Sequence, residues 1–204
     1  MRAPLFIYVH GFNSSPASIK AQLFGRYLSE HQVHANYEVP ALSHWPAQAM
    51  GQLCALVEAN TDRQIILIGS SLGGYYSTWL TEHYDHVRAV LVNPSIRPFV
   101  LLERWLGDNE NLYTHDHYEL TPEHLAQLQA INCNSLVDPG RYLLLVQTAD
   151  ETLDYQEAVD KFSESTQFVQ PGGSHGFDRF QDLIPAILAF GAGQIKLPPA
   201  SPLP

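Results

Sequence analysis

The residues from Gln64 to Tyr76, QIILIGSSLGGYY, place the strongest constraint on what this chain can fold into. The run from Gln64 to Ile68 is apolar and rich in β-branched residues, and its length suits a buried strand. Gly69 ends this run, and apolar residues at helical spacing follow from Leu72 to Leu80. The stretch therefore predicts a buried strand that passes through a sharp turn into a helix.

The turn reads Gly69-Ser70-Ser71-Leu72-Gly73 and fits the pattern G-x-S-x-G. About 0.07 chance matches are expected in a chain of roughly 200 residues, since each fixed residue makes up about 7% of usual composition. In this pattern the central serine is a nucleophile held on a strained turn. A side chain two residues before or after it would collide across the turn, which requires glycine at both places. Ser71 is thus the candidate nucleophile, supported by Gly69 and Gly73.

The same turn has an alternative interpretation without nucleophilic chemistry. A glycine-rich connection between strand and helix can be purely structural, or it can bind phosphate. Neither G-x-x-x-x-G-K-[ST] nor G-x-G-x-x-G occurs in the chain, which disfavours a phosphate-binding loop.

Composition indicates one domain without nucleic-acid or membrane partners. The chain has 204 residues, 45% of them hydrophobic, enough to bury the core of a single domain. A formal charge of −10 and 11 scattered Lys and Arg residues argue against binding to nucleic acid or anionic membranes. No run approaches the length of a membrane span, and the first residues lack the features of a secretory signal. Cys54 and Cys133 are isolated, so we expect reduced thiols and a cytoplasmic protein.

Strand-like runs alternate with helix-like segments along most of the chain. We expect strands at residues 4–9, 33–39, 64–68, 87–92, 141–147 and 166–169. We expect the main helices over residues 16–28, 47–59, 71–84, 155–162 and 177–190, the first with Ser15 as its N-cap. This alternation predicts the α/β class: a doubly wound, mainly parallel sheet of about six strands.

Two segments depart from the alternation. Residues 95–139 are rich in aromatic, acidic and histidine residues, and two short helices are expected within them. We interpret them as a small helical cap inserted into a single domain that spans residues 1–190. Residues 191–204 contain four prolines and no apolar periodicity, which predicts a disordered tail.

A serine nucleophile needs a histidine to accept its proton and a carboxylate to orient that histidine. His175 lies in the glycine-rich loop after the last expected strand, and Asp150 closely follows the strand before it. Both positions fall at the carboxyl edge of the sheet, where ligand sites of such sheets lie. Glu151 and Asp154 remain alternatives for the acid, and each of these carboxylates could instead cap a helix.

Acyl transfer also needs hydrogen-bond donors for the negative charge that develops on the carbonyl oxygen. The backbone N–H of Leu72 follows the candidate nucleophile at a helix N-terminus, and the loop after the first strand offers the N–H of Phe12. His10 and Gly11 belong to the same loop. We expect His10 to brace the loop through hydrogen bonds rather than to transfer protons.

Other polar residues suggest weaker alternatives. His115, Asp116, His117 and Glu119 lie close together, but two histidines without a third ligand at fixed spacing make a poor metal site, and no metal is expected. Arg97 and Arg104 could contact an acidic substrate group, or they could form ion pairs on the cap surface.

The segments YVHGFNSSPASIKA, IGSSLGGYYSTWL, LVNPSIRP, QTADETLDY and GGSHGFDRF resemble the YqiA-like esterase family (UPF0227) of small α/β-hydrolases, over about residues 4–190. The resemblance implies a bacterial, cytoplasmic serine esterase that acts on acyl esters and also on some thioesters. It implies a catalytic triad of Ser71, Asp150 and His175, with an oxyanion loop at His10-Gly11-Phe12 and no cofactor. The tail after Gly191 has no counterpart in the resemblance.

Several questions stay open on the sequence. The same triad could cleave an acyl thioester or a carbon–carbon bond next to a ketone, and a hydrolase fold can also serve as a binding protein without turnover. The expected partner is a small-molecule ester or thioester. A homo-oligomer is compatible with the sequence, as is a monomer.

Overall fold

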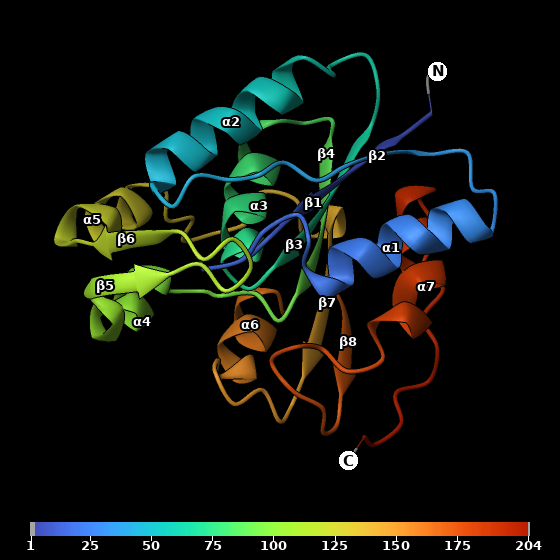
Figure 1. The fold of residues 1–204 in the computed structure, drawn as a ribbon. Helices are drawn as coiled ribbons and strands as arrows, with labels where there is room; N and C mark the ends of the chain where they lie inside the picture. The colour runs from blue at the N-terminus through green and yellow to red at the C-terminus, as the bar shows by residue number, and fades with distance from the viewer. Residues whose placement is uncertain (1–2, 204) are drawn as a thin grey trace.

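The computed structural model describes residues 3–203 and contains one six-stranded parallel sheet with helices on both faces (Figure 1). The strand order is β2-β1-β3-β4-β7-β8, and every neighbouring pair is parallel. Its strands are β1 (Leu5–Val9), β2 (Asn36–Glu38), β3 (Ile65–Ser70), β4 (Val87–Val92), β7 (Tyr142–Gln147) and β8 (Thr166–Gln170). The prediction of a doubly wound, parallel α/β sheet is confirmed.

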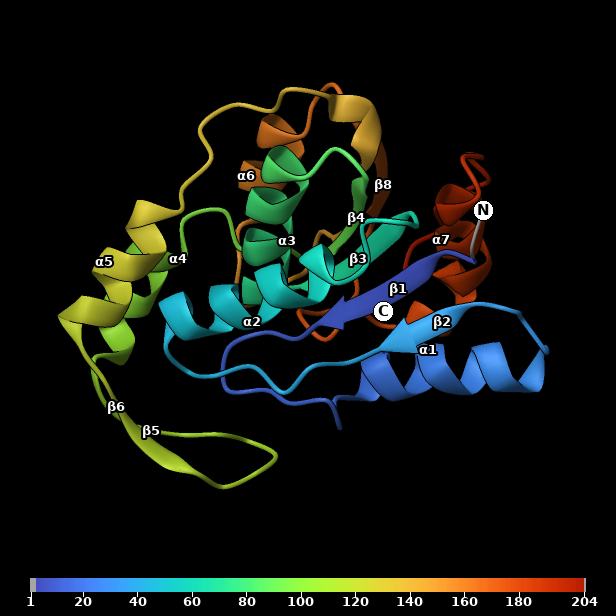
Figure 2. The same cartoon turned by 90° about the horizontal axis from the view of Figure 1, so that it is seen from above.

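Helices cover both faces of the sheet because its central strands are apolar on both sides. Alternate residues of each strand point to opposite faces, so Ile65 and Leu67 join one core cluster while Ile66 and Ile68 join the other. Helices α2 (Pro46–Glu58), α3 (Leu72–His83) and α6 (Tyr155–Lys161) cover the first face, and α1 (Ile19–Glu30) and α7 (Ile184–Gly191) cover the second (Figure 2). The result is a three-layer α/β/α domain.

The chain builds the sheet outward from β1 in both directions. Strand β2 lies on one side of β1, and β3 lies on the other. The connections that leave β1 and β3 therefore diverge to opposite faces, since α1 covers one face and α3 the other. Such a switch point opens a crevice at the carboxyl ends of the strands. The loop His10–Ser14 and the turn at Ser71 border this crevice.

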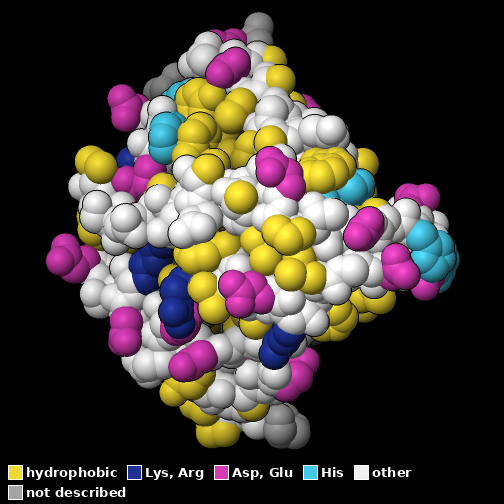
Figure 3. Space-filling view, turned by 90° about the vertical axis from the view of Figure 1, so that its left-hand side faces the viewer, with side chains coloured by type: hydrophobic (Ala, Val, Ile, Leu, Met, Phe, Trp, Pro, Cys, Tyr) yellow, Lys and Arg dark blue, Asp and Glu magenta, His cyan; other side chains and the backbone are white. Residues whose placement is uncertain are grey.

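The segment between β4 and β7, which was predicted to be a helical cap, contains both helices and strands. It contains α4 (Pro98–Leu101), the 3-10 helix η1 (Leu102–Trp105) and α5 (Pro122–Ala130). Between η1 and α5, β5 (Gly107–Glu110) and β6 (His117–Leu120) pair as an antiparallel hairpin that the sequence did not predict. Val100, Trp105 and Leu106 of this segment are exposed apolar residues. Figure 3 shows apolar side chains scattered over this side of the molecule.

Two predicted helix starts were wrong. The first helix begins at Ile19, because Ser15–Ser18 forms a turn in which Ser15 accepts hydrogen bonds from Ala17 and Ser18. The last helix was expected from Phe177, but Phe177 and Arg179 have φ values of 63° and 59°, which a right-handed helix excludes. Helical structure begins instead at the short 3-10 helix η3 (Phe180–Leu183) and continues into α7.

The proline-rich segment after α7 has no helix or strand in its described residues, yet it packs against the domain. The Leu203 N–H donates to the Pro171 carbonyl at 2.9 Å, and the Gln170 side chain donates to the Ser201 carbonyl. This differs from the disorder expected from composition. The segment lies beside the end of β8, an edge strand, where backbone groups are free of sheet partners.

Two histidines join the segment that leads into α2 to the cap. His124 is fully buried, and its Nδ1 accepts the Thr121 N–H at 3.1 Å, so its Nε2 carries the proton. That Nε2 lies 3.1 Å from Nδ1 of His44, which accepts from it. Burial lowers the pKa of both imidazoles, and the neighbouring His44 lowers the pKa of His124 further. The contact therefore needs both rings neutral.

None of the helices within residues 3–203 combines the length and the apolarity needed to cross a lipid bilayer.

We predict that Gly73→Ala destabilises the fold by about 3 kcal/mol, because an added Cβ would lie 1.9 Å from the Val9 carbonyl oxygen, a backbone atom that cannot move away. Gly51→Ala is the matched control in an exposed part of α2, where an added Cβ meets nothing within 4 Å. It should stabilise by about 0.5–1 kcal/mol through helix propensity. Urea denaturation measures both; equal effects would contradict the packing argument.

We predict that the free energy of unfolding falls as pH decreases below about 6.5, the ordinary pKa of histidine. In the folded state the pKa values of His44 and His124 are lowered, so the unfolded chain binds more protons in this range and is favoured by acid. His44→Gln should make the dependence shallower, since the amide oxygen can still accept from His124. Denaturation at pH 7.5, 6.5 and 5.5 tests this, with the exposed His34→Gln as control. An unchanged slope in His44→Gln would count against the pair's role.

Candidate active site

Ser71 occupies the turn between β3 and α3 in a strained backbone conformation. Its φ of 54° and ψ of −120° lie in a region of backbone conformation that residues other than glycine rarely adopt. Three hydrogen bonds hold this conformation: the Ser71 N–H donates to Val92 at 3.1 Å, and its carbonyl accepts from Gly74 at 2.9 Å and Ser95 at 3.0 Å. The contacts come from the adjacent strand end and the first turn of α3. The fold thereby fixes the serine at the carboxyl edge of the sheet.

The glycines around Ser71 leave no room for side chains. A Cβ on Gly69 would lie 2.5 Å from both the Gly73 carbonyl oxygen and the Ser77 Oγ. A Cβ on Gly11 would lie 3.1 Å from the Ser71 Cβ, which shows how closely the loop after β1 approaches the serine.

His175 connects Ser71 to Asp150. Its Nε2 lies 3.2 Å from the Ser71 Oγ, and its Nδ1 lies 2.8 Å and 3.0 Å from the two carboxylate oxygens of Asp150. A carboxylate accepts only, so Nδ1 carries the proton and Nε2 is free to accept from the serine hydroxyl. The Asp150 side chain is only 1% exposed, whereas that of His175 is 24% exposed. The structure thus brings together three residues that the sequence separates by up to 104 positions.

The two alternative acids have other partners. Oδ1 of Asp154 accepts the Gln156 N–H at 2.9 Å and caps α6. Oε2 of Glu151 accepts the backbone N–H of His175 at 2.9 Å, which holds the main chain of the loop and not the imidazole. Asp150 also accepts from the backbone of Thr152 and Leu153, each at 2.8 Å, so its carboxylate is well oriented. Asp150 is therefore the carboxylate that contacts the His175 ring.

Two buried amide side chains, which sequence reasoning missed, hold the loop that carries His175. Asn93 is 2% exposed and donates through Nδ2 to the carbonyls of Ser174 at 2.9 Å and His175 at 3.2 Å. Gln147 is fully buried, and its Oε1 accepts from the N–H groups of Ser174 and Asp178. The sequence signal that could have found them was their position: Gln147 is the last residue of β7 and Asn93 directly follows β4, at the sheet edge that carries Ser71.

The candidate oxyanion donors lie on either side of Ser71. Leu72 is the first residue of α3, and Phe12 follows Gly11 in the loop that abuts the serine. His10 is 5% exposed and braces this loop: its Nε2 accepts the Leu42 N–H at 3.1 Å, and its Nδ1 donates to the Gly11 carbonyl at 3.1 Å. Burial lowers the pKa of His10, which suits an uncharged structural role. Both ring nitrogens of His10 are engaged away from Ser71.

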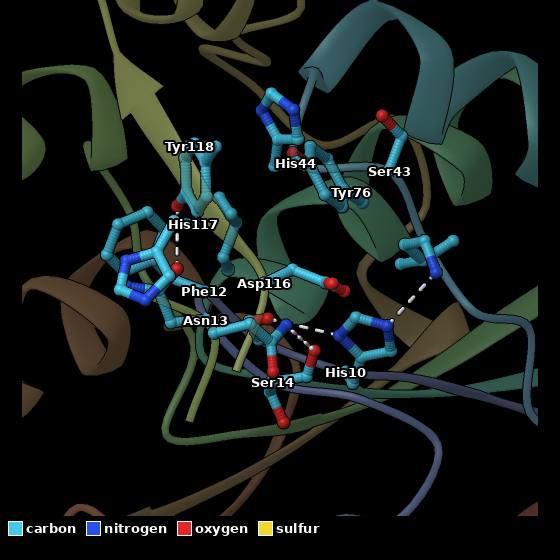
Figure 4. Close-up of a pocket in the computed structure, with 14 residues that line it drawn as sticks. His10, Phe12, Asn13, Ser14, Ser43, His44, Tyr76, Asp116, His117 and Tyr118 are labelled. Carbon is cyan, nitrogen blue, oxygen red and sulfur yellow. Dashed lines mark hydrogen bonds between the residues drawn. The ribbon is translucent and has the colours of Figure 1, made fainter. Parts of the chain in front are cut away.

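Two cavities flank the loop from Gly11 to Ser14. One of about 450 Å³ contains Ser71 and His175, and the other, of about 360 Å³, lies on the side of Leu72 and Tyr76. Both volumes fall in the range of small-molecule sites. The second cavity has a mixed lining, in which His44, Asp116, His117 and Tyr118 supply polar groups (Figure 4).

The cap hairpin is bound to the same loop. The Tyr118 hydroxyl donates to Oδ1 of Asn13 at 2.6 Å (Figure 4). The Leu112 N–H donates to the Asn13 carbonyl at 3.0 Å. Asn13 Nδ2 in turn donates to Oδ1 of Asn109 at 3.3 Å. The cap hairpin therefore contacts the loop that separates the two cavities. The sequence predicted neither the hairpin nor this contact.

Two other polar residues named from the sequence, His115 and Arg97, form ion pairs on the surface. His115 pairs with Glu110 at 2.6 Å, and over residues 3–203 no three His, Cys, Asp or Glu side chains lie close enough to hold a metal ion. Arg97 pairs with Glu157 on the surface.

Solved structures resemble this fold at low sequence identity. The mouse alpha/beta hydrolase domain-containing protein 10 matches with a TM-score of 0.70 and 14% identity over 92% of this chain and 88% of its own. The esterase domain of a Rhodothermus marinus protein matches with a TM-score of 0.62 and 16% identity over 94% of this chain and 85% of its own. Similarity at this level establishes the α/β-hydrolase fold.

Sequence comparison identifies the family. The UPF0227 protein YcfP from Salmonella paratyphi A is 21% identical over 188 residues, which cover 91% of this chain and 98% of the relative. Residues 5–192 match the family described as Uncharacterised protein family (UPF0227). The chain is thus an α/β-hydrolase-fold protein and belongs to the UPF0227 family.

Proposed function

We propose that this protein is a serine hydrolase that cleaves carboxylic (acyl) esters through Ser71, His175 and Asp150. The observation that supports this most strongly is the continuous chain of contacts from the Ser71 Oγ through both ring nitrogens of His175 to the Asp150 carboxylate. A structural histidine would not need an unprotonated nitrogen facing a serine on a strained turn. The esterase domain among the structural neighbours adds to the case.

In the first half of the proposed reaction, Nε2 of His175 takes the hydroxyl proton as Ser71 attacks the acyl carbonyl. The buried Asp150 stabilises the imidazolium that forms. The N–H groups of Leu72 and Phe12 donate to the oxyanion, where each such donor typically contributes about 10²–10³ in rate. His175 then protonates the departing alcohol, which leaves an acyl group on Ser71.

In the second half, His175 removes a proton from water, and the resulting hydroxide attacks the acyl-enzyme. The tetrahedral intermediate collapses, the acid leaves, and Ser71 recovers its proton from His175. No cofactor enters these steps. The two cavities beside Gly11 offer separate places for the acyl and alcohol parts of an ester.

A substrate panel separates an ester from a thioester preference, because oxygen and sulfur leaving groups can be compared on the same acyl chain.

The cytoplasmic location expected from the sequence remains a prediction.

We predict that Ser71→Ala and His175→Ala each lower kcat by about 10⁴–10⁶-fold and that the double variant is hardly worse, because triad members act as a unit. A fluorophosphonate probe should label the wild type on Ser71, with loss of fluoride, and should not label Ser71→Ala. Circular dichroism confirms that each variant is folded. Equal labelling of wild type and Ser71→Ala would remove the serine-hydrolase proposal.

We predict that Asp150→Asn lowers kcat by about 10⁴-fold, because an amide that donates to Nδ1 would leave the proton on the wrong nitrogen of His175. Asp154→Asn is the matched control, since asparagine also caps a helix and Asp154 does not contact His175. It should keep nearly full activity. Comparable losses in the two variants would show that Asp150 is not the specific partner of His175.

A further inference from the structure

The cavity that contains Ser71 also contains a lysine that the mechanism above does not use. Lys20 is the second residue of α1 and lines this cavity together with His175 and Gly176. Its Nζ donates to the Gly176 carbonyl at 2.9 Å, directly after the residue that carries the imidazole. A positive charge thus lies in the same cavity as the attacking hydroxyl.

The charge of Lys20 has no carboxylate partner among the described residues. The other cation that lines the cavity, Arg179, pairs with Asp182 at 2.6 Å. Asp178, also at the cavity wall, accepts from the Ser174 hydroxyl at 2.7 Å. The one partner found for Lys20 is a neutral carbonyl, which leaves two of the three ammonium protons for a ligand.

The Lys20 side chain is half-buried, so its ammonium group is partly withdrawn from water. Burial lowers the pKa of Lys20 to about 8, although the nearby Asp150 acts in the opposite direction. The free-energy cost of removing water from a charged group is offset when an opposite charge or strong hydrogen bonds replace the water. A carboxylate on a bound molecule would supply both, because charge-assisted hydrogen bonds are about twice as strong as neutral ones.

The rim of the cavity adds a second property. Ile19, Leu112 and Tyr113 line it and are 71%, 73% and 40% exposed. A molecule that fits both features has a short hydrocarbon part beside this rim and an acidic group at Lys20.

We propose that Lys20 determines substrate specificity by binding a carboxylate carried by the ester, so that the protein prefers esters with a free acid group over neutral ones of the same shape. This inference rests on the proposed function and deepens it. The carboxylate can belong to the acyl part or to the alcohol part, and paired substrates distinguish the two.

The experiment compares kcat/KM for matched acidic and neutral esters. For the acyl side, 4-nitrophenyl hemisuccinate is paired with its methyl ester; for the alcohol side, 4-carboxyphenyl butyrate is paired with 4-carbamoylphenyl butyrate. In at least one pair the wild type should prefer the acid. Lys20→Met should lower kcat/KM for that acid by about 10- to 100-fold, mainly through KM, and change the neutral partner less than about 3-fold.

Two further variants complete the design. Lys20→Arg should retain most of the preference, because guanidinium also binds carboxylate. Arg26→Met removes a charge from the exposed face of the same helix and should leave the preference unchanged. If Lys20→Met lowers kcat equally for the acidic and the neutral ester, the specificity role is overturned. Lys20 would then only support the loop at Gly176.

The pH dependence gives an independent readout. Lys20 loses its charge as pH rises through about 8, so the wild-type preference for the acid should decline above that pH, while that of Lys20→Arg persists. The other titratable or charged groups at this cavity are Tyr8, Tyr113, His175, Asp178 and Arg179, with Asp150 behind His175. His175 acts on both esters of a pair, so its contribution cancels in the ratio.

The outcomes separate the two proposals. If the wild type labels with fluorophosphonate and hydrolyses the neutral esters without preferring either acid, the Lys20 proposal fails and the serine hydrolase stands. If it neither labels nor hydrolyses any ester, both proposals fall together.

Discussion

The hydrogen bonds that hold Ser71 in its strained, positive-φ backbone conformation are the constraint on which the rest of the site depends. Strain of this kind persists only when the surroundings determine it from several directions. Here Val92 binds the amide of Ser71 while Gly74 and Ser95 bind its carbonyl. The sheet and the first turn of α3 both contribute, so the position of the Ser71 hydroxyl follows from the global fold. His175 then needs to reach this one hydroxyl, and Asp150 needs to reach His175.

The loop that carries His175 is held as firmly as the serine. Asn93 and Gln147 are buried side chains at the ends of adjacent strands, and together they satisfy backbone groups from Ser174 to Asp178. Buried amides of this kind are worth most when all their hydrogen bonds are made. The sheet edge thus orients the base through its main chain, whereas Asp150 orients it through the ring. This division leaves the imidazole free to move a proton without moving the loop.

The sequence predicted the features that have short-range signals. Strand Val87–Val92 and the turn at Ser71 follow from an apolar run and a glycine pattern, and the order of Ser71, Asp150 and His175 follows from the order of the strands. The hairpin of β5 and β6 was missed because GDNE contains no apolar residue, so the short alternating run HYEL had no recognisable partner strand beside it. The predicted start of α1 was wrong because Ser15-Pro16 and Ser18-Ile19 both offer a serine that can cap a helix, and the helix begins at the second of them. The roles of Asn93, Gln147 and Lys20 depend on residues distant in sequence, which local patterns do not encode.

The most direct test of this account is a crystal structure of the protein after reaction with a fluorophosphonate. The account predicts a covalent bond between phosphorus and the Ser71 Oγ, with the phosphonyl oxygen about 3 Å from the amide nitrogens of both Leu72 and Phe12 and His175 still bound to Asp150. A phosphonyl group on another residue, or one whose oxygen points away from both amides, would contradict it.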